Sequence, residues 1–360
     1  MSYSLPSEIP IDAGGGAEGL VGAARDVFDD QMPDPNEPQD AMIATRALTR
    51  TFKGGVEAVR GIDMTVAPGE VFGFLGPNGA GKTTTVRMLC TLLPPTNGSA
   101  AVAGYDVAHA AKDVRKRIGV ALQEIGLDPV QTGRELLELQ CGLYRITGKH
   151  AKARTQELLE LVGLTDAADR YTKTYSGGMK RRLDLASALV HQPQVLFLDE
   201  PTNGLDPASR LTIWDEVRRI NDSGTTVFLT TQYLEEADRL CGRLAIIDGG
   251  RIVAEGTPEQ LKAQMGRDVV TVSFENGDIA EAEESLGGLP GLERIVIEQH
   301  ALALYVEDGA GSIAEIVRRF ERDQIRVSSI SVARPTLDDV FLSATGRRIE
   351  GVDDAEEVIR

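Results

Sequence analysis

One glycine-rich loop of this sequence combines residue types and spacing that fit a definite chemistry. Glycines at these intervals let a loop curl so that successive backbone N–H groups point at one anion. Lys82 can then reach the terminal phosphates of a nucleotide, and the hydroxyl of Thr83 can bind Mg²⁺. We therefore expect a phosphate-binding loop formed by Gly76, Pro77, Asn78, Gly79, Ala80, Gly81, Lys82, Thr83 and Thr84.

The segments on either side of this loop support that expectation. The apolar run at residues 71–75 is typical of a buried strand, and residues 85–93 have the pattern of a helix. A strand before the loop and a helix after it are the context that a phosphate-binding loop requires. The positive N-terminal end of that helix would face the same phosphates. A bound nucleotide is the first prediction.

Two adjacent acids end a second apolar run at residues 196–200. A carboxylate at the end of a strand beside a phosphate loop can hold Mg²⁺ directly or through water, which fits Asp199. Glu200 would then lie next to the γ-phosphate, where it can orient or deprotonate an attacking water. On their own, two acids at the end of a strand are more often simply solvated. Together with the phosphate loop they supply the missing parts of one site.

A third segment, Ser176-Gly177-Gly178-Met179, precedes a helical pattern. Ser176 can cap that helix, and Gly177 and Gly178 expose backbone donors at its positive end. An N-capped helix that binds nothing is the ordinary explanation for such a segment. However, it lies 94 residues after Lys82 and 23 residues before Asp199, so it falls between the two halves of the nucleotide site.

The elements that must position these motifs can be predicted from their periodicity. Apolar strands that alternate with helices predict a mostly parallel sheet covered on both faces. Residues 132–163 form a helical insert that starts with the capping-box pair Thr132 and Glu135. The predicted strands lie at 43–52, 56–66, 100–104, 117–123, 194–198, 225–230, 244–247 and 251–254, and the later helices at 208–220 and 233–240.

A second unit runs from residue 269 to residue 334. Its pattern is strand, helix, strand, strand, helix, strand, with residues 308–311 as a turn, and this is the order of a ferredoxin-like α+β sandwich. No catalytic constellation occurs in it, which favours a role in packing or regulation. We divide the chain into an acidic tail at 1–40, a nucleotide-binding domain at 41–265, an accessory domain at 266–346 and a charged tail at 347–360.

Composition limits the possible partners. The chain has 360 residues and a formal net charge of −17, and affinity for nucleic acid depends on Lys and Arg that neutralise phosphates. We therefore expect no nucleic-acid partner. The two tails hold much of the excess charge, since residues 1–40 carry nine acids against Arg25. No apolar run is long enough to span a bilayer, and no signal peptide is evident. The three cysteines, Cys90, Cys141 and Cys241, are odd in number and far apart, so we expect reduced, partly buried thiols.

The three motifs in this order resemble the ATP-binding subunits of ATP-binding cassette (ABC) transporters. Residues 76–84 look like a Walker A loop, 196–200 like a Walker B strand, and 176–178 like the family's signature. Lesser matches are Gln123 at the Q-loop position, Asp206 within a D-loop-like segment, and Phe52 in place of the adenine-stacking aromatic. The resemblance covers residues 42–265. It implies a P-loop NTPase fold with an antiparallel β subdomain and a helical insert.

At two positions the sequence departs from the usual family pattern, and these departures indicate a subgroup of the family. The signature has Met179 where the family usually has Gln, and the switch position after the strand at 225–230 has Gln232 where the family usually has His. Glutamine can donate one hydrogen bond to a γ-phosphate but brings no positive charge, so we expect Gln232 to sense the phosphate rather than carry a proton. With the C-terminal segment 335–342, these features resemble the daunorubicin/doxorubicin-resistance type of subunit.

The resemblance implies a mechanism and partners. ATP and Mg²⁺ would be held between two copies of the chain: one copy gives Phe52, the phosphate loop, Gln123, Asp199 and Glu200, and the other gives Ser176 and Gly178. Gly177 and Asp206 would also bind the nucleotide. Thr83, Gln123 and Asp199 would bind the metal, and Lys82, Glu200, Gln232 and Gln123 would take part in hydrolysis. Closing and reopening of the dimer would drive a separate integral-membrane permease through the region after Gln123.

The resemblance implies a peripheral subunit at the cytoplasmic face of the cell membrane, which drives the export of a hydrophobic drug or lipid by the permease. One alternative is a soluble ABC ATPase of the chromosome or repair type, which has no permease. Such proteins insert hundreds of coiled-coil residues between the phosphate loop and the signature, whereas only 94 residues separate Lys82 from Ser176 here. Ribosome-acting cassette proteins usually hold two cassettes, and this chain has one phosphate loop. The other alternative is an ATP sensor that does not hydrolyse, and Glu200 argues against it.

Overall fold

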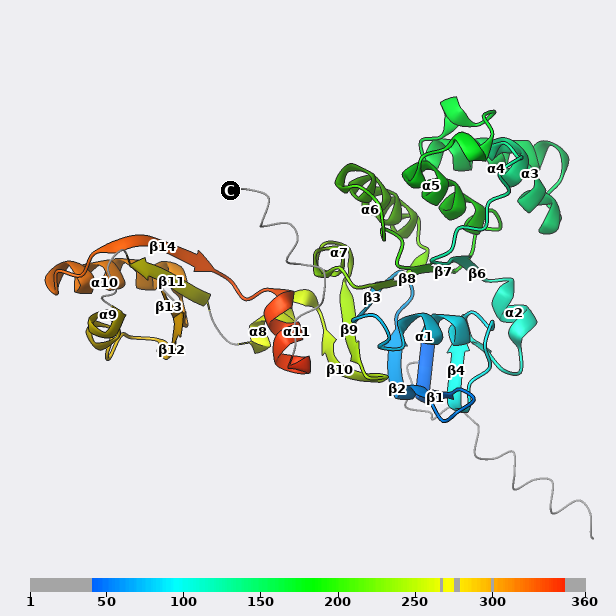
Figure 1. Ribbon diagram of the computed structural model, residues 1–360. Coiled ribbons are helices and arrows are strands. Elements are labelled where there is room, and N and C mark those ends of the chain that lie inside the picture. Colours follow the sequence, from blue (N-terminus) through cyan, green and yellow to red (C-terminus); the bar gives the residue numbers. More distant parts are fainter. Residues whose placement is uncertain (1–40, 266–267, 275–278, 299–300, 347–360) are drawn as a thin grey trace, which may run out of the picture. The chain divides into compact units, whose positions relative to one another are not determined.

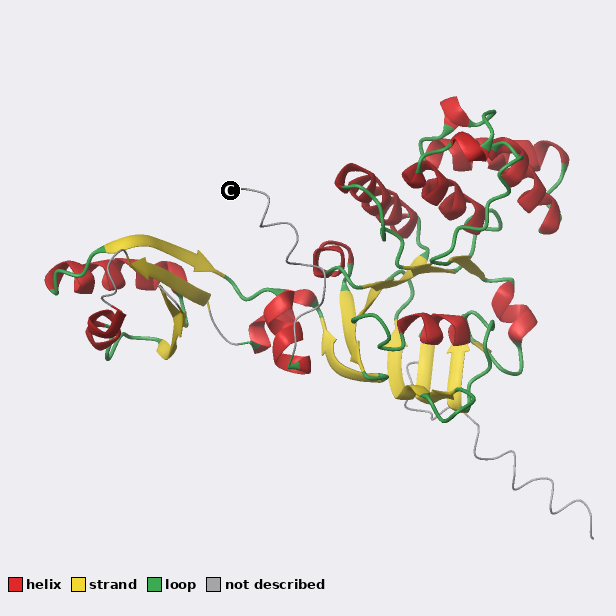
Figure 2. Cartoon of the chain, in the orientation of Figure 1, coloured by secondary structure: helices red, strands yellow, loops and turns green. Residues whose placement is uncertain are grey.

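The computed structural model describes residues 41–265, 268–274, 279–298 and 301–346. At its centre is a six-stranded sheet (Figures 1 and 2). Five neighbouring strands are parallel, and the edge strand β10 is antiparallel to β9. The order across the sheet is β10 (Arg251–Gly256), β9 (Arg243–Asp248), β3 (Val71–Leu75), β8 (Thr226–Thr231), β7 (Val195–Asp199) and β6 (Ile118–Ala121).

A second, antiparallel sheet holds the N-terminal strands. Its order is β2 (Glu57–Val66), β1 (Ile43–Thr51), β4 (Asn97–Val102) and β5 (Tyr105–Asp106). Helix α1 (Lys82–Leu89) lies between the two sheets in Figure 1, and α2 (Ala111–Arg115) leads into β6. The strands predicted at 43–52 and 56–66 are confirmed. The helix predicted at 85–93 begins three residues earlier, so Lys82 and Thr83 belong to its first turn.

The helical insert lies on the opposite side of the central sheet from α1 (Figure 1). The predicted segment 132–163 forms two helices, α3 (Gly133–Leu143) and α4 (Gly148–Leu161), and they are followed by α5 (Gly177–Ala188) and α6 (Pro207–Asp222). The capping box is confirmed, because the Thr132 hydroxyl accepts from the backbone N–H of Glu135 and the Glu135 carboxylate accepts from that of Thr132. Helix α7 (Leu234–Leu240) follows β8.

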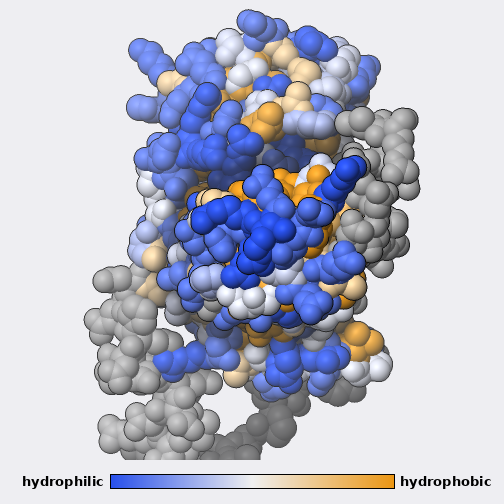
Figure 3. Space-filling model, turned by 90° about the vertical axis from the view of Figure 1, so that its left-hand side faces the viewer, coloured by the Kyte–Doolittle hydropathy of each residue, from blue (hydrophilic) through white to orange (hydrophobic). Residues whose placement is uncertain are grey.

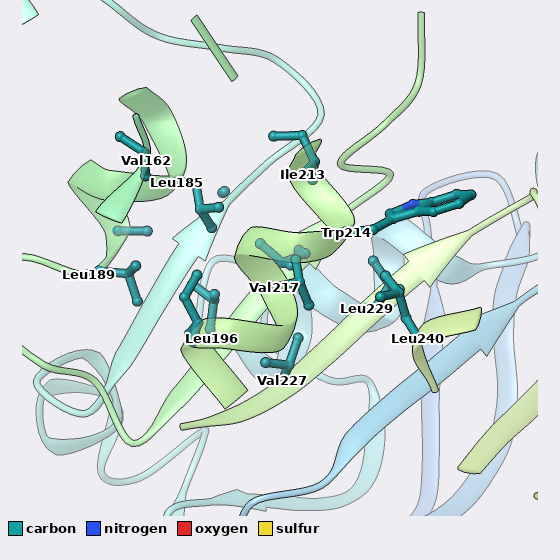
Figure 4. Close-up of a cluster of buried hydrophobic side chains, with 14 of the residues drawn as sticks. Val162, Leu185, Leu189, Leu196, Ile213, Trp214, Val217, Val227, Leu229 and Leu240 are labelled. Atoms are coloured by element: carbon teal, nitrogen blue, oxygen red, sulfur yellow. The ribbon is translucent and has the colours of Figure 1, made fainter. Parts of the chain in front are cut away.

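Alternating side chains of the central strands pack into two separate hydrophobic cores. On β3, Phe72 and Phe74 belong to the core shared with α1 and the antiparallel sheet, while Val71 and Leu75 belong to the core under the helical insert. Figure 4 shows the second core, where side chains of α5 and α6 meet those of β7 and β8. The central sheet is thus buried on both faces, as its apolar strands predict.

The C-terminal unit has the predicted strand and helix order. Its four-stranded antiparallel sheet is arranged β12-β13-β11-β14, with its own core between the sheet and the two helices. Residues 308–311, predicted as a turn, are instead the N-cap and first turn of α10, because the Asp308 carboxylate accepts from the backbone N–H of Gly311. The elements are β11 (Asp268–Phe274), α9 (Ile279–Ser285), β12 (Leu292–Glu298), β13 (Ala301–Val306), α10 (Gly309–Arg322) and β14 (Val327–Ala333).

Two further helices flank this unit in the sequence, α8 (Pro258–Gln264) and α11 (Leu337–Thr345). Helix α11 contacts α8, α7 and β10. Its apolar side chains Leu337, Val340 and Phe341 are buried in the same hydrophobic core as the helical insert. The last helix therefore packs with the nucleotide-binding fold and not with the sandwich core that precedes it in the sequence.

Among the helices of the described residues, none is long and apolar enough to cross a membrane. The face drawn in Figure 3 is largely hydrophilic, with smaller apolar areas. All three cysteines are buried and free, as predicted. The predicted tails at 1–40 and 347–360 lie outside the described residues.

Candidate nucleotide-binding site

The phosphate loop lines one side of a cleft of about 390 Å³. Its tight turn into α1 depends on Gly81, which has a φ of 109° and would bring a Cβ atom to 2.5 Å from the backbone oxygen of Ala58. Since no side chain caps α1, the first backbone N–H groups of this helix are available to an anion. The cleft is lined by Phe52, Val56, Ala58, Pro77, Asn78, Gly79, Gly81, Lys82, Thr83, Thr84, Gln123 and Glu200.

Lys82 lies with its ammonium inside the curled loop. The Nζ atom donates to the backbone oxygens of Gly76 at 2.6 Å and Pro77 at 3.1 Å, and it forms an ion pair with Glu200 Oε1 at 3.1 Å. Burial lowers the pKa of the Lys82 ammonium, and the charges of Glu200 and Asp199 offset part of this effect. The cation is therefore held at the place where phosphate oxygens would come within its reach.

Asp199 presents one paired and one unpaired oxygen at the end of β7. Its Oδ1 accepts hydrogen bonds from the hydroxyls of Thr230 at 2.5 Å and Thr83 at 3.3 Å. Its Oδ2 is buried and has no hydrogen-bond partner among the described residues. A buried carboxylate oxygen without a partner is costly, and oxygen ligands are those that Mg²⁺ prefers. Asp199 and Thr83 therefore fit a magnesium ion.

Glu200 occupies the centre of the polar side chains in the cleft. Besides Lys82 on Oε1, its Oε2 accepts from Gln123 Nε2 at 3.2 Å and from Asn203 Nδ2 at 3.1 Å. Its backbone φ is 49°, a left-handed conformation that is uncommon for a residue with a side chain. Its backbone N–H donates to the oxygen and the hydroxyl of Thr230, at 3.0 and 3.1 Å. Several contacts therefore fix the direction of this carboxylate.

Three of the weaker sequence matches can now be located. Phe52 is 39% exposed and lines the cleft, with the Arg50 guanidinium 5.0 Å from its ring centre. Gln123 follows β6 and reaches Glu200 directly. Gln232 follows β8, whose last residue Thr231 accepts a hydrogen bond from the Gly76 backbone N–H, but it does not line the cleft.

The signature residues lie elsewhere in the same chain. Ser176 is the N-cap of α5, where its hydroxyl accepts from the backbone N–H of Met179 as predicted. Asp206 is the N-cap of α6, and hydrogen bonds from Ser209 lower the pKa of its carboxyl. At Gly178 an added Cβ would meet Ser209 Oγ at 2.7 Å, so α5 and α6 approach closely there. The lining residues of the cleft include none of Ser176, Gly177, Gly178 or Asp206, all of which the structure describes.

Several residues of the site were not assigned a role from the sequence. Thr230 bonds both Asp199 and the Glu200 backbone, although the Thr230-Thr231 strand end was a visible signal. Asn203 bonds Glu200 from the segment after the strand. Arg181 donates to backbone oxygens beside both carboxylates. No local sequence signal marks Arg181 or Asn203, since their partners are fixed by tertiary packing.

Comparisons with known proteins decide the family. The family model described as "ABC transporter" matches residues 59–203, and that described as "ATP-binding protein DrrA1-3-like, C-terminal domain" matches residues 256–345. The chain is similar to the daunorubicin resistance ATP-binding protein DrrA2 of Streptomyces coeruleorubidus, with 46% identity over 87% of this chain and 98% of that protein. The chain belongs to the ATP-binding proteins of ABC transporters, in the daunorubicin/doxorubicin-resistance group.

Other relatives of this ABC protein agree. The daunorubicin/doxorubicin resistance ATP-binding protein DrrA of Streptomyces peucetius is 45% identical over 84% of this chain and 92% of its own length. Among solved structures, the dimeric bacterial ABC transporter cassette MJ0796 is 27% identical, with a TM-score of 0.56 over 60% of this chain and 98% of that chain. The predicted family, fold class and activity are confirmed: this chain is an ATP-hydrolysing ABC transporter subunit.

Proposed function

We propose that two copies of this chain hold two ATP molecules between them and use hydrolysis to drive a membrane permease that exports a hydrophobic drug or lipid. The observation that carries the proposal is the placement of Glu200, whose carboxylate lies between Lys82 and Gln123 in the cleft. Three groups thus lie together in the cleft: Glu200 as the candidate base, Lys82 as the cation that binds phosphate, and Gln123 as a polar side chain that can contact the attacking water.

The roles of the side chains follow from this arrangement. Phosphate oxygens bound in the loop would replace the backbone oxygens of Gly76 and Pro77 as acceptors for Lys82 Nζ. Gln123 and Asn203 hold the Glu200 carboxylate by its Oε2 atom, so the carboxylate can accept a proton from a water in a fixed direction. Gln232, directly after β8, senses the γ-phosphate through a hydrogen bond. Phe52 stacks on the adenine.

A magnesium ion belongs to this proposal. Thr83 and Asp199 would hold it, with Gln123 nearby, and the free Asp199 Oδ2 supports that assignment. When bound, Mg²⁺ neutralises charge on the phosphate oxygens and so favours transfer of the terminal phosphoryl group to water. Thr230 keeps the Asp199 carboxylate oriented through its hydroxyl.

Assembly into a dimer would complete the site. Ser176, Gly177, Gly178 and Asp206 do not line the cleft of their own chain, so a second chain must present them if they are to contact ATP. Ser176 and Gly177, at the N-terminal end of α5, are exposed, and the N-terminal end of a helix suits a phosphate. Solved relatives support this arrangement, since the cassette MJ0796 was solved as a dimer bound to ADP and Pi.

The permease would dock in a groove of about 380 Å³ whose lining includes Leu122, and the region just after Gln123 would pass the motion of the dimer to it. Leu92, which is 56% exposed, lines this groove together with Leu122 and Tyr144. Because Leu122 directly precedes Gln123, a helix of the permease in this groove would contact the main chain that carries a site residue. This contact would hold the chain at the cytoplasmic face of the membrane. The relatives named for daunorubicin and doxorubicin resistance support a hydrophobic cargo.

The substitution Glu200→Gln tests the proposal. The amide keeps the size of the side chain and removes the base, so we expect steady-state hydrolysis to fall about 10²- to 10³-fold while ATP binding persists. The variant should then accumulate as an ATP-bound dimer in size-exclusion chromatography, and Lys82→Ala, which weakens phosphate binding, should remain monomeric. Undiminished hydrolysis by the Glu200→Gln chain would refute the assignment of the base.

A further inference from the structure

Arg181 lies inside the protein although it belongs to the signature helix α5. The residue is 4% exposed. Its Nε donates to the backbone oxygen of Pro201 at 2.9 Å, its Nη2 to that of Asp199 at 3.1 Å, and its Nη1 to that of Leu122. An ion pair with Asp184 Oδ2 at 3.3 Å accompanies these bonds. A buried cation requires such partners, and hydrogen bonds from a charged donor are the stronger ones.

The three carbonyl groups that Arg181 binds lie beside the two side chains that meet in the cleft. Leu122 directly precedes Gln123, and Asp199 and Pro201 are the neighbours of Glu200 on either side. Gln123 and Glu200 are themselves joined by the 3.2 Å hydrogen bond between Nε2 and Oε2. One guanidinium group therefore fixes the main chain directly before Gln123 and on both sides of Glu200.

The backbone of Glu200 needs that support. A left-handed φ of 49° in a residue with a side chain persists only where the surroundings hold it. The Thr230 contacts hold the Glu200 backbone N–H, and Arg181 holds the carbonyl groups before and after the residue. The bonds point in different directions from a planar fork, which a lysine ammonium on a flexible stem does not reproduce.

We propose that Arg181 is a positioning residue that couples the signature helix α5 to the Gln123–Glu200 pair of the same chain. The coupling rests on the proposed function, in which Ser176 and Gly178 at the start of α5 contact the ATP held by the partner chain. Arg181 is one helical turn further along, so a shift of α5 on the partner's ATP moves the guanidinium and the carbonyl groups it binds. Each ATP molecule thereby adjusts the catalytic pair at the other site.

The substitution Arg181→Lys tests the positioning role. Charge and approximate length remain, while the fork is lost. We expect the affinity for ATP to stay within about twofold, because Arg181 does not line the cleft. We expect kcat to fall about ten- to hundredfold, the size of effect that a misplaced catalytic group gives. Arg182→Lys is the matched control, since Arg182 donates to the backbone oxygens of Val162 and Gly163 in the helical insert. An unchanged kcat in Arg181→Lys would overturn the proposal.

Mixed dimers separate positioning from a general effect on α5. Two full-length chains are joined by a flexible linker, and one of them carries Lys82→Ala, so that only the other chain's phosphate loop binds ATP. Arg181→Lys in the ATP-binding chain should lower hydrolysis about as much as in the homodimer. The same substitution in the Lys82→Ala chain, which supplies only its signature, should leave most of the activity. The reverse pattern would show that Arg181 merely supports the signature and would overturn the positioning role.

The coupling itself is measured in linked dimers without Lys82→Ala, where assembly does not depend on ATP, by the dependence of hydrolysis on ATP concentration. With two coupled sites the wild-type Hill coefficient exceeds one, and Arg181→Lys should bring it to about one. A wild-type Hill coefficient of one, or the same value above one in Arg181→Lys, would refute the coupling. Failure of the proposed function is distinguishable, because the wild-type chain would then form no ATP-dependent dimer at all.

Discussion

The buried acid Glu216 gives this protein a pH-dependent stability that one substitution should remove. Glu216 lies on α6 at 3% exposure, and its Oε2 has no hydrogen-bond partner within the described part of the chain. Burial raises the pKa of its carboxyl to about 8 from an ordinary value of 4.5, and the charges of Arg182 and Arg219 only partly offset the rise. The negative charge of the neighbouring Asp215 also raises the pKa of Glu216.

The raised pKa sets both the sign and the size of the effect. Between pH 4.5 and about 8 the folded chain holds a proton on Glu216 that the unfolded chain has released, so the free energy of unfolding falls as the pH rises. One pH unit corresponds to somewhat more than 1 kcal/mol, so the fall amounts to about 2–3 kcal/mol between about pH 5.5 and pH 7.5. Glutamine has the shape of the protonated acid and does not titrate. The Glu216→Gln chain should therefore lose this part of the pH dependence and be the more stable chain at the higher pH.

Urea unfolding of the two chains at several pH values and constant ionic strength measures this difference. Other buried acids, including Asp184 and Glu236, whose pKa values are also raised by burial, titrate in both chains and cancel in the comparison. Glu235→Gln, at an exposed residue of α7, is the matched control and should change stability by the same small amount at every pH. If the wild-type and Glu216→Gln chains differ by a constant amount across this range, the reasoning about burial is wrong.

Two further substitutions test the groove and the last helix. Leu92→Glu places a charge in the proposed permease groove. We expect a smaller fraction of the chain in washed membranes of the cells that produce it, because the charge opposes docking. The ATPase rate of the purified chain should stay within about twofold. Val253→Glu, at an exposed position outside the groove, is its control, and equal losses from both would argue against the groove. Phe341→Ala removes a buried ring of α11 and should lower the free energy of unfolding by about 3–5 kcal/mol. The neighbouring Leu342→Ala, at a 38% exposed residue, should change it by less than about 1 kcal/mol, and a similar result for both would mean that α11 does not support the core.

Much of the site was predictable because its parts are local. The phosphate loop needs glycine at fixed positions and a lysine at one end, so residues 76–84 identify it without reference to the rest of the chain. The caps at Thr132 and Ser176 are equally local, since a hydroxyl reaches a backbone N–H three residues ahead. The strand and helix order of the C-terminal unit also follows from periodicity, because alternation and helical spacing are properties of short segments.

The remaining features depend on residues that are distant in the sequence. Helix α11 has an ordinary apolar pattern, and only packing assigns Phe341 to the core of the nucleotide-binding fold. The unpaired Asp199 Oδ2 can be recognised only once the neighbours of β7 are known. No pattern in the sequence indicates that Glu200 has a positive φ, because this conformation is imposed by its surroundings.

The sequence by itself determined that this protein binds a nucleotide, and the ordered motifs identified its family. Such motifs act through backbone groups and side chains a few residues apart, so the spacing of these residues in the sequence indicates their chemistry. Only the tertiary structure decided how the motifs are joined. Arg181 binds carbonyl groups that lie 59 and 20 residues away, and it connects two loops of the cleft to the helix that begins at Ser176. The fold around a buried arginine determines its hydrogen-bond partners, and its position in the sequence does not indicate which residues these are.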